Sequence, residues 1–438
     1  MSHNQPMTMK RLLVSFLTTL LALALPPTVS SQSMKWVSVQ EIYAKGKHNA
    51  WPDLCRWRDQ YYVVFAGHGE GHAEPHGVVM LSSPDGEHWE TVFDEPQQHW
   101  KIHDDESWSA MTSFFLPTAE RLYVVFWSRS NNPDWAKIPA GKERELKRQW
   151  LELGGNEQSF QRWTQAHGQL FRTGVTYTED GKTWAKPQSL LPDGWWLWRP
   201  QTFGGRHYLV AYYNHAQQWE MTDELKQMVR PSSQIDPDHP KSGHLVEYFQ
   251  SACLFVSDDA MNWTKVSDIA VDDNDETGLG FRSDGRALVV SRIDASPDYA
   301  IGYVADPPYQ QWKRFVLDED IDQPAVLHHQ GRWIVGGRYR DVKTWNRPNR
   351  FDPNRLEGRI GTRLWFFNDE TGELTEGTTL PSWGDCGQPA LVPMPSGDLM
   401  AAYYSCSQMI DANQAVGGGP FPGKYSPASI YVARIMMK

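Results

Sequence analysis

One short turn motif recurs along this sequence: a hydroxyl residue followed by Asp, often by Gly, and then by Trp. It occupies positions 83–89, 178–184 and 257–263, with weaker copies at 305–312 and 368–374. The hydroxyl and the carboxylate can accept hydrogen bonds from nearby backbone amides, Gly adopts positive φ, and Trp anchors the loop by packing. A turn repeated this often predicts a fold made of copies of one unit.

A second recurring element is a turn followed by a run rich in Val, Tyr, Phe and Ile, which is a strand composition with a hairpin start. Its copies lie at 58–66, 120–127, 205–213, 284–291, 330–337 and 396–404. Each copy and its flanking apolar stretches make a meander of about four strands, and a ring of such meanders buries their faces. We predict an all-β, six-bladed β-propeller.

Three further expectations concern the ends and the insertions of this propeller. The final strand, 429–434, is expected to close the ring by pairing with the first blade. Two longer segments, 131–171 and 215–247, interrupt the regular spacing of the predicted strands, and the first contains a charged helical pattern at 140–148. Segments of this length in a compact fold are either functional lids or surface decorations.

The N-terminus has the pattern of a secretory signal peptide. Lys10 and Arg11 precede an apolar run at 12–25 and then prolines and small residues, and the run is shorter than the roughly 20 residues of a membrane span. We predict a signal peptide at 1–31 and one propeller domain at 32–438. The mature protein is expected to be secreted or periplasmic, without stable membrane insertion.

The net charge and the cysteines indicate which partners and which cross-links the protein can have. A net charge of −11 argues against nucleic acid as the main partner, although local arginines can still bind an anionic substrate. The cysteines show no metal-binding spacing, so three disulfide pairings and buried free thiols all remain open. They are Cys55, Cys253, Cys386 and Cys406.

The segment 275–292 carries the most specific pattern, because Asp275-Glu276 opens one strand and Arg292 closes its hairpin partner. With the Asp turns and the six blades, it resembles the sialidase (neuraminidase) superfamily and its BNR-repeat, or Asp-box, members. The resemblance implies a glycoside hydrolase in which Glu276 polarises the nucleophile. It also implies that Arg292 and Arg359, or Arg363 in place of Arg359, bind a substrate carboxylate, to which guanidinium groups bond bidentately.

Two departures separate this sequence from a true sialidase. The arginine that the family carries at the start of the first inner strand is missing from 49–54, and Gln388 stands where the family has its nucleophilic Tyr. The covalent tyrosine route is therefore not supported. We predict a sialidase-like protein rather than a sialidase.

Other residues are candidates for the catalytic roles that the missing family Tyr and Arg would have. The first blade is rich in histidine, at His48, His68, His72 and His76, and histidine serves as a general acid or base near neutral pH. We predict His72 and Asp53 as catalytic residues beside Glu276, and Asp104, Asp105 and Glu106 are alternatives to Asp53 as the acid/base. The spacing His68-x-Glu70-x-His72 also fits a metal site, but it is unspecific, so we predict no metal and no cofactor.

The Trp-rich segment 194–200 opens the third blade. Trp195 is predicted to stack on a sugar ring and Arg199 to bind an acidic sugar, whereas Trp196 and Trp198 fit the propeller core.

Three functions remain open at this stage. The first is a secreted hydrolase of an acidic glycan. The second is a polysaccharide lyase that uses histidine and arginine on the same propeller. The third is a glycan-binding propeller without turnover, because fold alone does not fix function.

Overall fold

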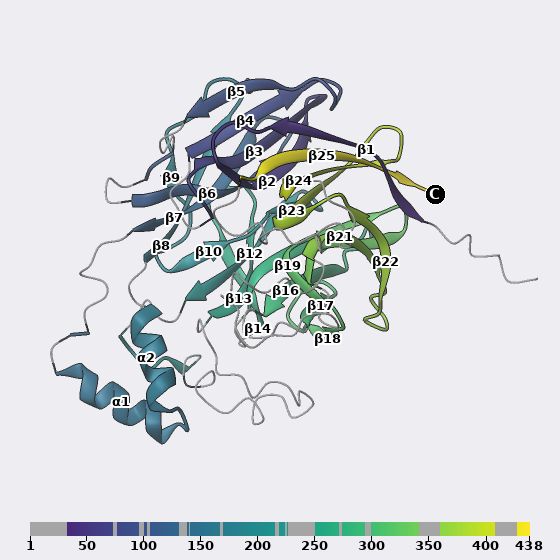
Figure 1. The fold of residues 1–438 in the computed structure, drawn as a ribbon. Coiled ribbons are helices and arrows are strands. Elements are labelled where there is room, and N and C mark those ends of the chain that lie inside the picture. The colour runs from purple at the N-terminus through teal and green to yellow at the C-terminus, as the bar shows by residue number, and fades with distance from the viewer. Residues whose placement is uncertain are drawn as a thin grey trace, which may run out of the picture.

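The computed structural model describes residues 33–72, 77–95, 100–102, 106–130, 138–139, 141–166, 170–214, 219–223, 226, 250–270, 274–293, 299–340, 360–407 and 427–438. Within these residues the strands form six antiparallel sheets, each of which contacts the next, and the last contacts the first (Figure 1). The predicted six-bladed β-propeller is therefore confirmed.

The first blade consists of β2 (His48–Trp57), β3 (Gln60–Gly69), β4 (Gly77–Ser83) and β5 (Glu90–Glu95). The second consists of β6 (Glu106–Pro117), β7 (Leu122–Ser130), β8 (Leu170–Thr178) and β9 (Gln188–Ser189). The third consists of β10 (Trp195–Leu197), β11 (Gln201–Phe203), β12 (Arg206–Asn214), β13 (Gln250–Ser257) and β14 (Thr264–Ala270). The fourth blade consists of β15 (Asn274–Phe281), β16 (Ala287–Ile293), β17 (Ala300–Ala305) and β18 (Lys313–Leu317). The fifth consists of β19 (Asp320–His329), β20 (Arg332–Arg340), β21 (Ile360–Phe367) and β22 (Leu374–Leu380). The sixth consists of β23 (Trp383–Pro393), β24 (Leu399–Ser407), β25 (Ser429–Met437) and β1 (Met34–Tyr43). The six predicted turn-and-strand units are the strands β3, β7, β12, β16, β20 and β24. Both faces of these strands are buried, as in β3, where Val63 and Phe65 pack into one hydrophobic cluster and Tyr62 and Val64 into another, and this explains the continuous runs of apolar residues.

The two ends of the described chain close the ring together. β1 pairs antiparallel with β25, which pairs with β24 in the last blade. The expectation that the final strand joins the first blade is thus wrong: the N-terminal strand crosses to the last blade instead. The N-terminal strand fills the outer edge of that blade, so this edge does not remain unpaired.

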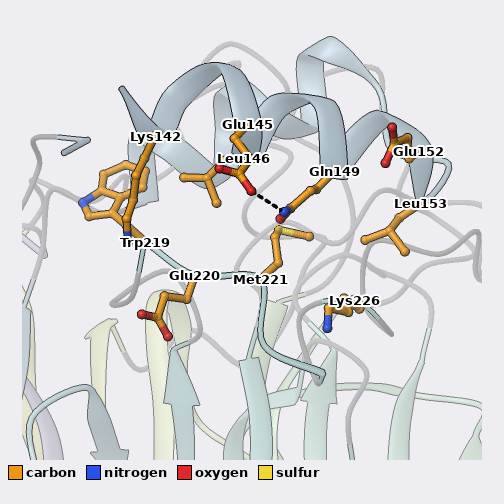
Figure 2. A pocket seen from close by; sticks show the side chains of 10 residues that line it. All are labelled: Lys142, Glu145, Leu146, Gln149, Glu152, Leu153, Trp219, Glu220, Met221 and Lys226. Atoms are coloured by element: carbon orange, nitrogen blue, oxygen red, sulfur yellow. Dashed lines mark hydrogen bonds between the residues drawn. The ribbon is translucent and has the colours of Figure 1, made fainter. Parts of the chain in front are cut away.

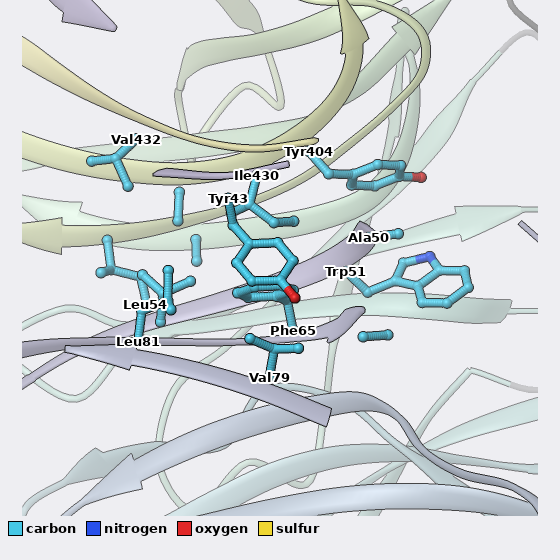
Figure 3. Close-up of a cluster of buried hydrophobic side chains, with 14 of the residues drawn as sticks. Tyr43, Ala50, Trp51, Leu54, Phe65, Val79, Leu81, Tyr404, Ile430 and Val432 are labelled. Carbon is cyan, nitrogen blue, oxygen red and sulfur yellow. The ribbon is translucent and has the colours of Figure 1, made fainter. Parts of the chain in front are cut away.

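A hydrophobic cluster holds the closure together. It joins β1, β2, β3, β24 and β25, and Figure 3 shows Tyr43, Trp51, Phe65, Tyr404 and Ile430 packed in it. All five are at most 5% exposed. Burial of a large apolar side chain contributes about 1.5–3 kcal/mol, so this cluster stabilises the contact between the first and last blades.

The three Asp turns share one hydrogen-bond pattern. In the turn between β8 and β9, the Asp180 carboxylate accepts from the backbone amides of Lys182 at 2.8 Å and Thr183 at 2.7 Å, and Thr178 Oγ1 accepts from Gly181 N at 2.9 Å. Asp85 and Asp259 accept from the corresponding amides in the turns after β4 and β13. The motif therefore ends the third strand of a blade, away from the inner strands.

Replacing all three aspartates (Asp85, Asp180 and Asp259) by Ala should lower the Tm by about 3–6 °C, because distant capping losses add. Backbone hydrogen bonds hold the pKa of each carboxyl well below its usual range. The ionised carboxylates stabilise the fold above the unfolded pKa of about 4, and this stabilisation is lost as the pH falls through the lowered pKa. Thermal unfolding of both proteins between pH 7 and pH 2 tests this, since the difference in Tm should shrink toward pH 2.

The helix that the charged pattern at 140–148 predicts is present, and a second helix that was not predicted follows it inside the second blade. They are α1 (Lys142–Glu152) and α2 (Glu157–Ala166). Trp150 of α1 and Trp163 of α2 stack with ring centroids 5.1 Å apart, so the pair has a small core of its own. Among the described residues, no helix has the length and hydrophobicity to cross a membrane. The predicted signal peptide and most of 215–247 lie outside the described residues.

Candidate functional site

Three inner strands depart from regular pairing at equivalent points, each just before a proline. Trp51 in β2, Gln323 in β19 and Gln388 in β23 have φ of 55°, 54° and 43°, and the strand register shifts beside each. Positive φ costs a residue other than Gly about 1–3 kcal/mol, and such strain gathers at functional sites. A bulge also changes the direction of neighbouring side chains. β23 contacts both β2 and β19, so the irregular segment of β23 lies between those of its two neighbours on the inner side of the ring.

Polar side chains at these points form one connected network, which we call the axial cluster. Its members are His48, His72, Asp275, Glu276, Arg292, Asp322, Gln323, Arg338, Asp385 and Tyr404. They come from β2, the turn after β3, and the first two strands of each of the last three blades.

The Glu276–Arg292 pair is the part of the cluster that the sequence pattern indicates. Both residues lie on the β15–β16 hairpin, where Thr277 pairs with Ser291, and Arg292 Nη1 lies 3.2 Å from Glu276 Oε1. The other oxygen, Glu276 Oε2, accepts from the backbone amide of Gln323 at 2.7 Å. The Glu276 side chain is 14% exposed, so it is fixed in orientation but still reachable.

Asp322 links the two guanidinium groups of the cluster. Its carboxylate lies 2.9 Å from Arg292 Nε and 2.7 Å from Arg338 Nη2, and the Asp322 side chain is 1% exposed. Arg338 Nη1 lies 3.5 Å from Asp385 Oδ1. The guanidinium of Arg338 thus joins the carboxylates of two blades.

Asp385 is contacted by two histidines and a tyrosine. Asp385 Oδ2 lies 2.8 Å from His48 Nε2 and 2.6 Å from His72 Nδ1, while Tyr404 donates its hydroxyl to Oδ1 at 3.0 Å. Burial alone would raise the pKa of Asp385, but the charge of His72 and the hydrogen bonds from both histidines hold it well below its usual range. Asp385 is therefore a carboxylate at neutral pH. His48 is fully buried, whereas the His72 side chain is 25% exposed.

Tyr404 does not replace the missing nucleophile. Its side chain is fully buried, and burial raises the pKa of its hydroxyl well above the usual value. A nucleophilic Tyr needs access to the substrate and an activated oxygen. Gln388, at the position of the family Tyr, is 1% exposed, and neither polar atom of its amide has a hydrogen-bond partner in the part of the chain that the structure describes.

Asp53 and Arg199 form a second ion pair on the inner strands. Arg199 Nε lies 2.5 Å from Asp53 Oδ1, and the backbone amide of Phe115 donates to Asp53 Oδ2 at 2.7 Å. Asp53 is 1% exposed with both oxygens engaged, so it positions Arg199, and this geometry argues against the predicted catalytic role. Arg199 keeps a buried Nη2 that has no partner among the described residues.

The remaining predicted residues have different surroundings. Trp195 packs on Tyr213 and Phe255, with ring centroids 5.1 and 4.9 Å away, so its described contacts belong to the blade core and its sugar stacking stays a prediction. Trp196 and Trp198 pack in the core, as expected. Arg359 lies outside the described residues. All four cysteines are free thiols.

The predicted histidine motif does not form one site. His68 is hydrogen-bonded to Asp94 and to Tyr43, whereas Glu70 pairs with Lys47. His72 alone of the three joins the axial cluster. The alternation of side chains expected for an extended strand fails because β3 ends at Gly69 and His72 lies in the following turn.

A separate cavity of about 480 Å³ lies between α1 and residues 219–221 and 226 (Figure 2). Leu146, Trp219 and Met221 give it an apolar side. Its charged lining residues Lys142 and Glu152 are exposed to solvent, which screens their interactions. The buried, connected charges of the axial cluster make it the stronger candidate for a catalytic site.

Gly387 keeps two members of the cluster in place. Its φ is 135°, and a Cβ added there would lie 2.5 Å from Gln323 Oε1 and 2.9 Å from Arg338 Cβ. We expect Gly387→Ala to lower the free energy of unfolding by about 2–4 kcal/mol, from backbone strain and overpacking together. Urea-induced unfolding measures this loss.

Gly331→Ala is the matched control, because Gly331 also has positive φ, 77°, but a Cβ there meets nothing within 4 Å. It should cost about 1 kcal/mol, the backbone strain alone. Equal losses for the two variants would show that the contacts around Gly387 are unimportant.

Comparison with known proteins supports the architecture. No protein-family model matches the chain, and no curated protein sequence matches it. A protein of unknown function from Dyadobacter fermentans has a similar structure, with 16% identity and a TM-score of 0.59 over 93% of this chain and 100% of that one. Trypanosoma rangeli sialidase in complex with the inhibitor DANA is also similar, with 12% identity and a TM-score of 0.50.

The sialidase match covers 92% of this chain and 59% of the sialidase, so the chain spans little more than half of that enzyme. An α-L-arabinanase from Penicillium chrysogenum aligns at 11% identity with a TM-score of 0.48, over 91% of this chain and 98% of that one. The likeness to the Dyadobacter protein and to the sialidase shows that the chain has a sialidase-like propeller fold.

Proposed function

We propose that this protein is a secreted or periplasmic carbohydrate-active enzyme that hydrolyses a glycosidic bond at the axial cluster. The observation that carries the proposal is Glu276, a partly exposed carboxylate whose oxygens are held by Arg292 and by the amide of Gln323. A carboxyl group fixed in this way is suited to proton transfer with the leaving oxygen of a sugar. The fold likeness to a sialidase is consistent with this function.

Water, rather than a side chain, is the proposed nucleophile. Gln388 and the fully buried Tyr404 offer no activated hydroxyl. His72 and Asp385 lie in the same network as Glu276 and supply a second polar group, as direct hydrolysis requires. We therefore propose that Glu276, in its protonated form, gives its proton to the leaving oxygen, while the His72–Asp385 pair accepts the proton of the attacking water and returns it to Glu276 through solvent after product release.

The proposed substrate is an acidic glycan. Arg292 and Arg338 are 13% and 12% exposed, so a carboxylate or sulfate that reaches the cluster would meet two guanidinium groups, which Asp322 already holds in place. Trp195 and Arg359 remain predicted contributors to this binding.

A panel of sialylated, uronic-acid-containing and neutral polysaccharides tests the function. We expect new reducing ends from at least one acidic glycan and no product that absorbs in the ultraviolet. New reducing ends from neutral glycans alone would contradict the proposal that the substrate is an acidic glycan. Binding without any product from any member would support a glycan-binding propeller instead.

A polysaccharide lyase is the second candidate, and the observation that favours it is the His72–Asp385 pair beside Arg338. A histidine oriented by a carboxylate can remove the C5 proton of a uronate whose charge an arginine offsets. Its product is an unsaturated uronide that absorbs in the ultraviolet, so the same panel separates the two reactions.

A further inference from the structure

Three donor atoms from separate parts of the propeller converge inside the axial cluster. They are His48 Nε2 from β2, His72 Nδ1 from the turn after β3, and Asp385 Oδ2 from β23, and all lie within 4.8 Å of one another. His48 is fully buried and the Asp385 side chain is 8% exposed, so the donors are held by the packed fold. His72 is the most exposed of the three, which leaves one side of the group open to solvent.

From these donors we infer that His48, His72 and Asp385 form a binding site for one divalent transition-metal ion such as Zn²⁺. Two imidazoles and a carboxylate suit Zn²⁺ and its neighbours, whereas Ca²⁺ and Mg²⁺ prefer oxygen ligands. Three protein ligands with one open position are also the arrangement of catalytic zinc sites. This inference departs from the sequence-based expectation of no metal.

The distances require a small expansion when an ion enters. Asp385 Oδ2 lies 2.8 and 2.6 Å from the two imidazole nitrogens. Tetrahedral zinc, with bonds of about 2.0–2.2 Å, separates its ligand atoms by about 3.3–3.5 Å. A movement of roughly 0.5–0.9 Å therefore opens the site. His72 lies in a turn and can adjust more easily than His48 in its buried strand.

The groups around Asp385 match the outer shell of a metal site. Asp385 Oδ1 accepts from the Tyr404 hydroxyl at 3.0 Å and lies near Arg338, which leaves Oδ2 for the ion. Carboxylate ligands are usually held by such outer hydrogen bonds. The Trp51 ring, with its centroid 5.0 Å from that of His72, gives the site an apolar wall.

The charges of the cluster also favour a cation. Four carboxylates (Asp275, Glu276, Asp322 and Asp385) and two guanidiniums (Arg292 and Arg338) are connected among the described residues. Metal ligation requires neutral imidazoles, and with both histidines neutral a dication beside Asp385 adds positive charge where carboxylates outnumber guanidiniums. The binding site stands on this geometry, while a role for the ion in holding the attacking water rests on the proposed function.

Metal titration of the purified, chelator-treated protein tests the site. Calorimetry should show one equivalent of Zn²⁺ bound, Co²⁺ should give the visible spectrum of a nitrogen and oxygen site, and Zn²⁺ should raise the Tm. Mg²⁺ and Ca²⁺ should have no such effect. His72→Ala and Asp385→Asn should each weaken Zn²⁺ binding at least 100-fold, and Tyr404→Phe about 10-fold.

His68→Ala is the matched control, because His68 is also a partly exposed histidine bonded to a carboxylate, but outside the cluster. It should change the Zn²⁺ affinity less than about threefold. The inference is overturned by the absence of stoichiometric binding, by binding that survives both His72→Ala and Asp385→Asn, or by thiolate bands in the Co²⁺ spectrum. Metal binding without glycan cleavage would refute only the proposed function, and cleavage by the metal-free, non-binding protein would refute only the metal site.

Discussion

Glu276→Gln should lower kcat on the cleaved glycan by about 10²–10⁴-fold, because an amide cannot exchange a proton with the leaving oxygen. The variant keeps the size of the side chain, and the amide oxygen can still accept from the Gln323 amide. Substrate binding should therefore change much less than kcat. Steady-state kinetics on the substrate found in the polysaccharide panel measure both effects.

Glu179→Gln is the matched control, since Glu179 lies at a turn between outer strands and its side chain is 64% exposed. It should leave kcat and KM unchanged. If Glu276→Gln retains more than about a tenth of the activity, Glu276 does not transfer the proton. A rise in KM at constant kcat would assign Glu276 to binding instead.

Asp322→Ala should lower the free energy of unfolding by about 3–5 kcal/mol, because it leaves two buried guanidiniums without their shared carboxylate. Asp322 is 1% exposed and lies within 2.9 Å of both Arg292 and Arg338. Urea-induced unfolding followed by tryptophan fluorescence measures the loss. Activity should fall as well, because Arg292 also contacts Glu276.

Asp284→Ala serves as the control for Asp322→Ala. Asp284 also pairs with an arginine, Arg282, but its side chain is 58% exposed, and exposed ion pairs contribute little to stability. A stability loss as small for Asp322→Ala as for Asp284→Ala would mean that the axial network does not support the fold.

The repeated patterns predicted the fold because every blade is built from the same local elements. A hairpin of β-branched and aromatic residues and an Asp turn are encoded within about 30 consecutive residues, so one sequence suffices to detect them. The pairing of β1 with β25 escaped prediction, because partners almost 400 residues apart leave no local signal. Most residues between the two buried ends of β1 are exposed or partly buried without a regular alternation, so its sequence does not specify which sheet edge it joins.

Sequence spacing indicated the contact between Glu276 and Arg292 because these residues share a hairpin, and the histidine-rich first blade indicated His72 but not its partner. Glu276 and Arg292 have adjacent positions in the β15–β16 register, and their spacing in the sequence indicates this contact. Asp322, Arg338 and Asp385 were missed, since they reach the cluster from separate blades. One signal was available: Gln-Pro-Ala occurs at 323–325 and again at 388–390, at the two bulges that carry the inner acidic residues.

The sequence by itself determined the number of blades, the Asp turns and the Glu276–Arg292 hairpin, because these depend on hydrogen bonds and packing between near neighbours. The tertiary structure alone decided how the ring closes, that Asp53 is buried behind Arg199, and that His72 rather than His68 faces Asp385. Inner strands of different blades meet only when the ring is complete. The chemistry of the axial cluster is therefore a property of the closed propeller and of no single repeat.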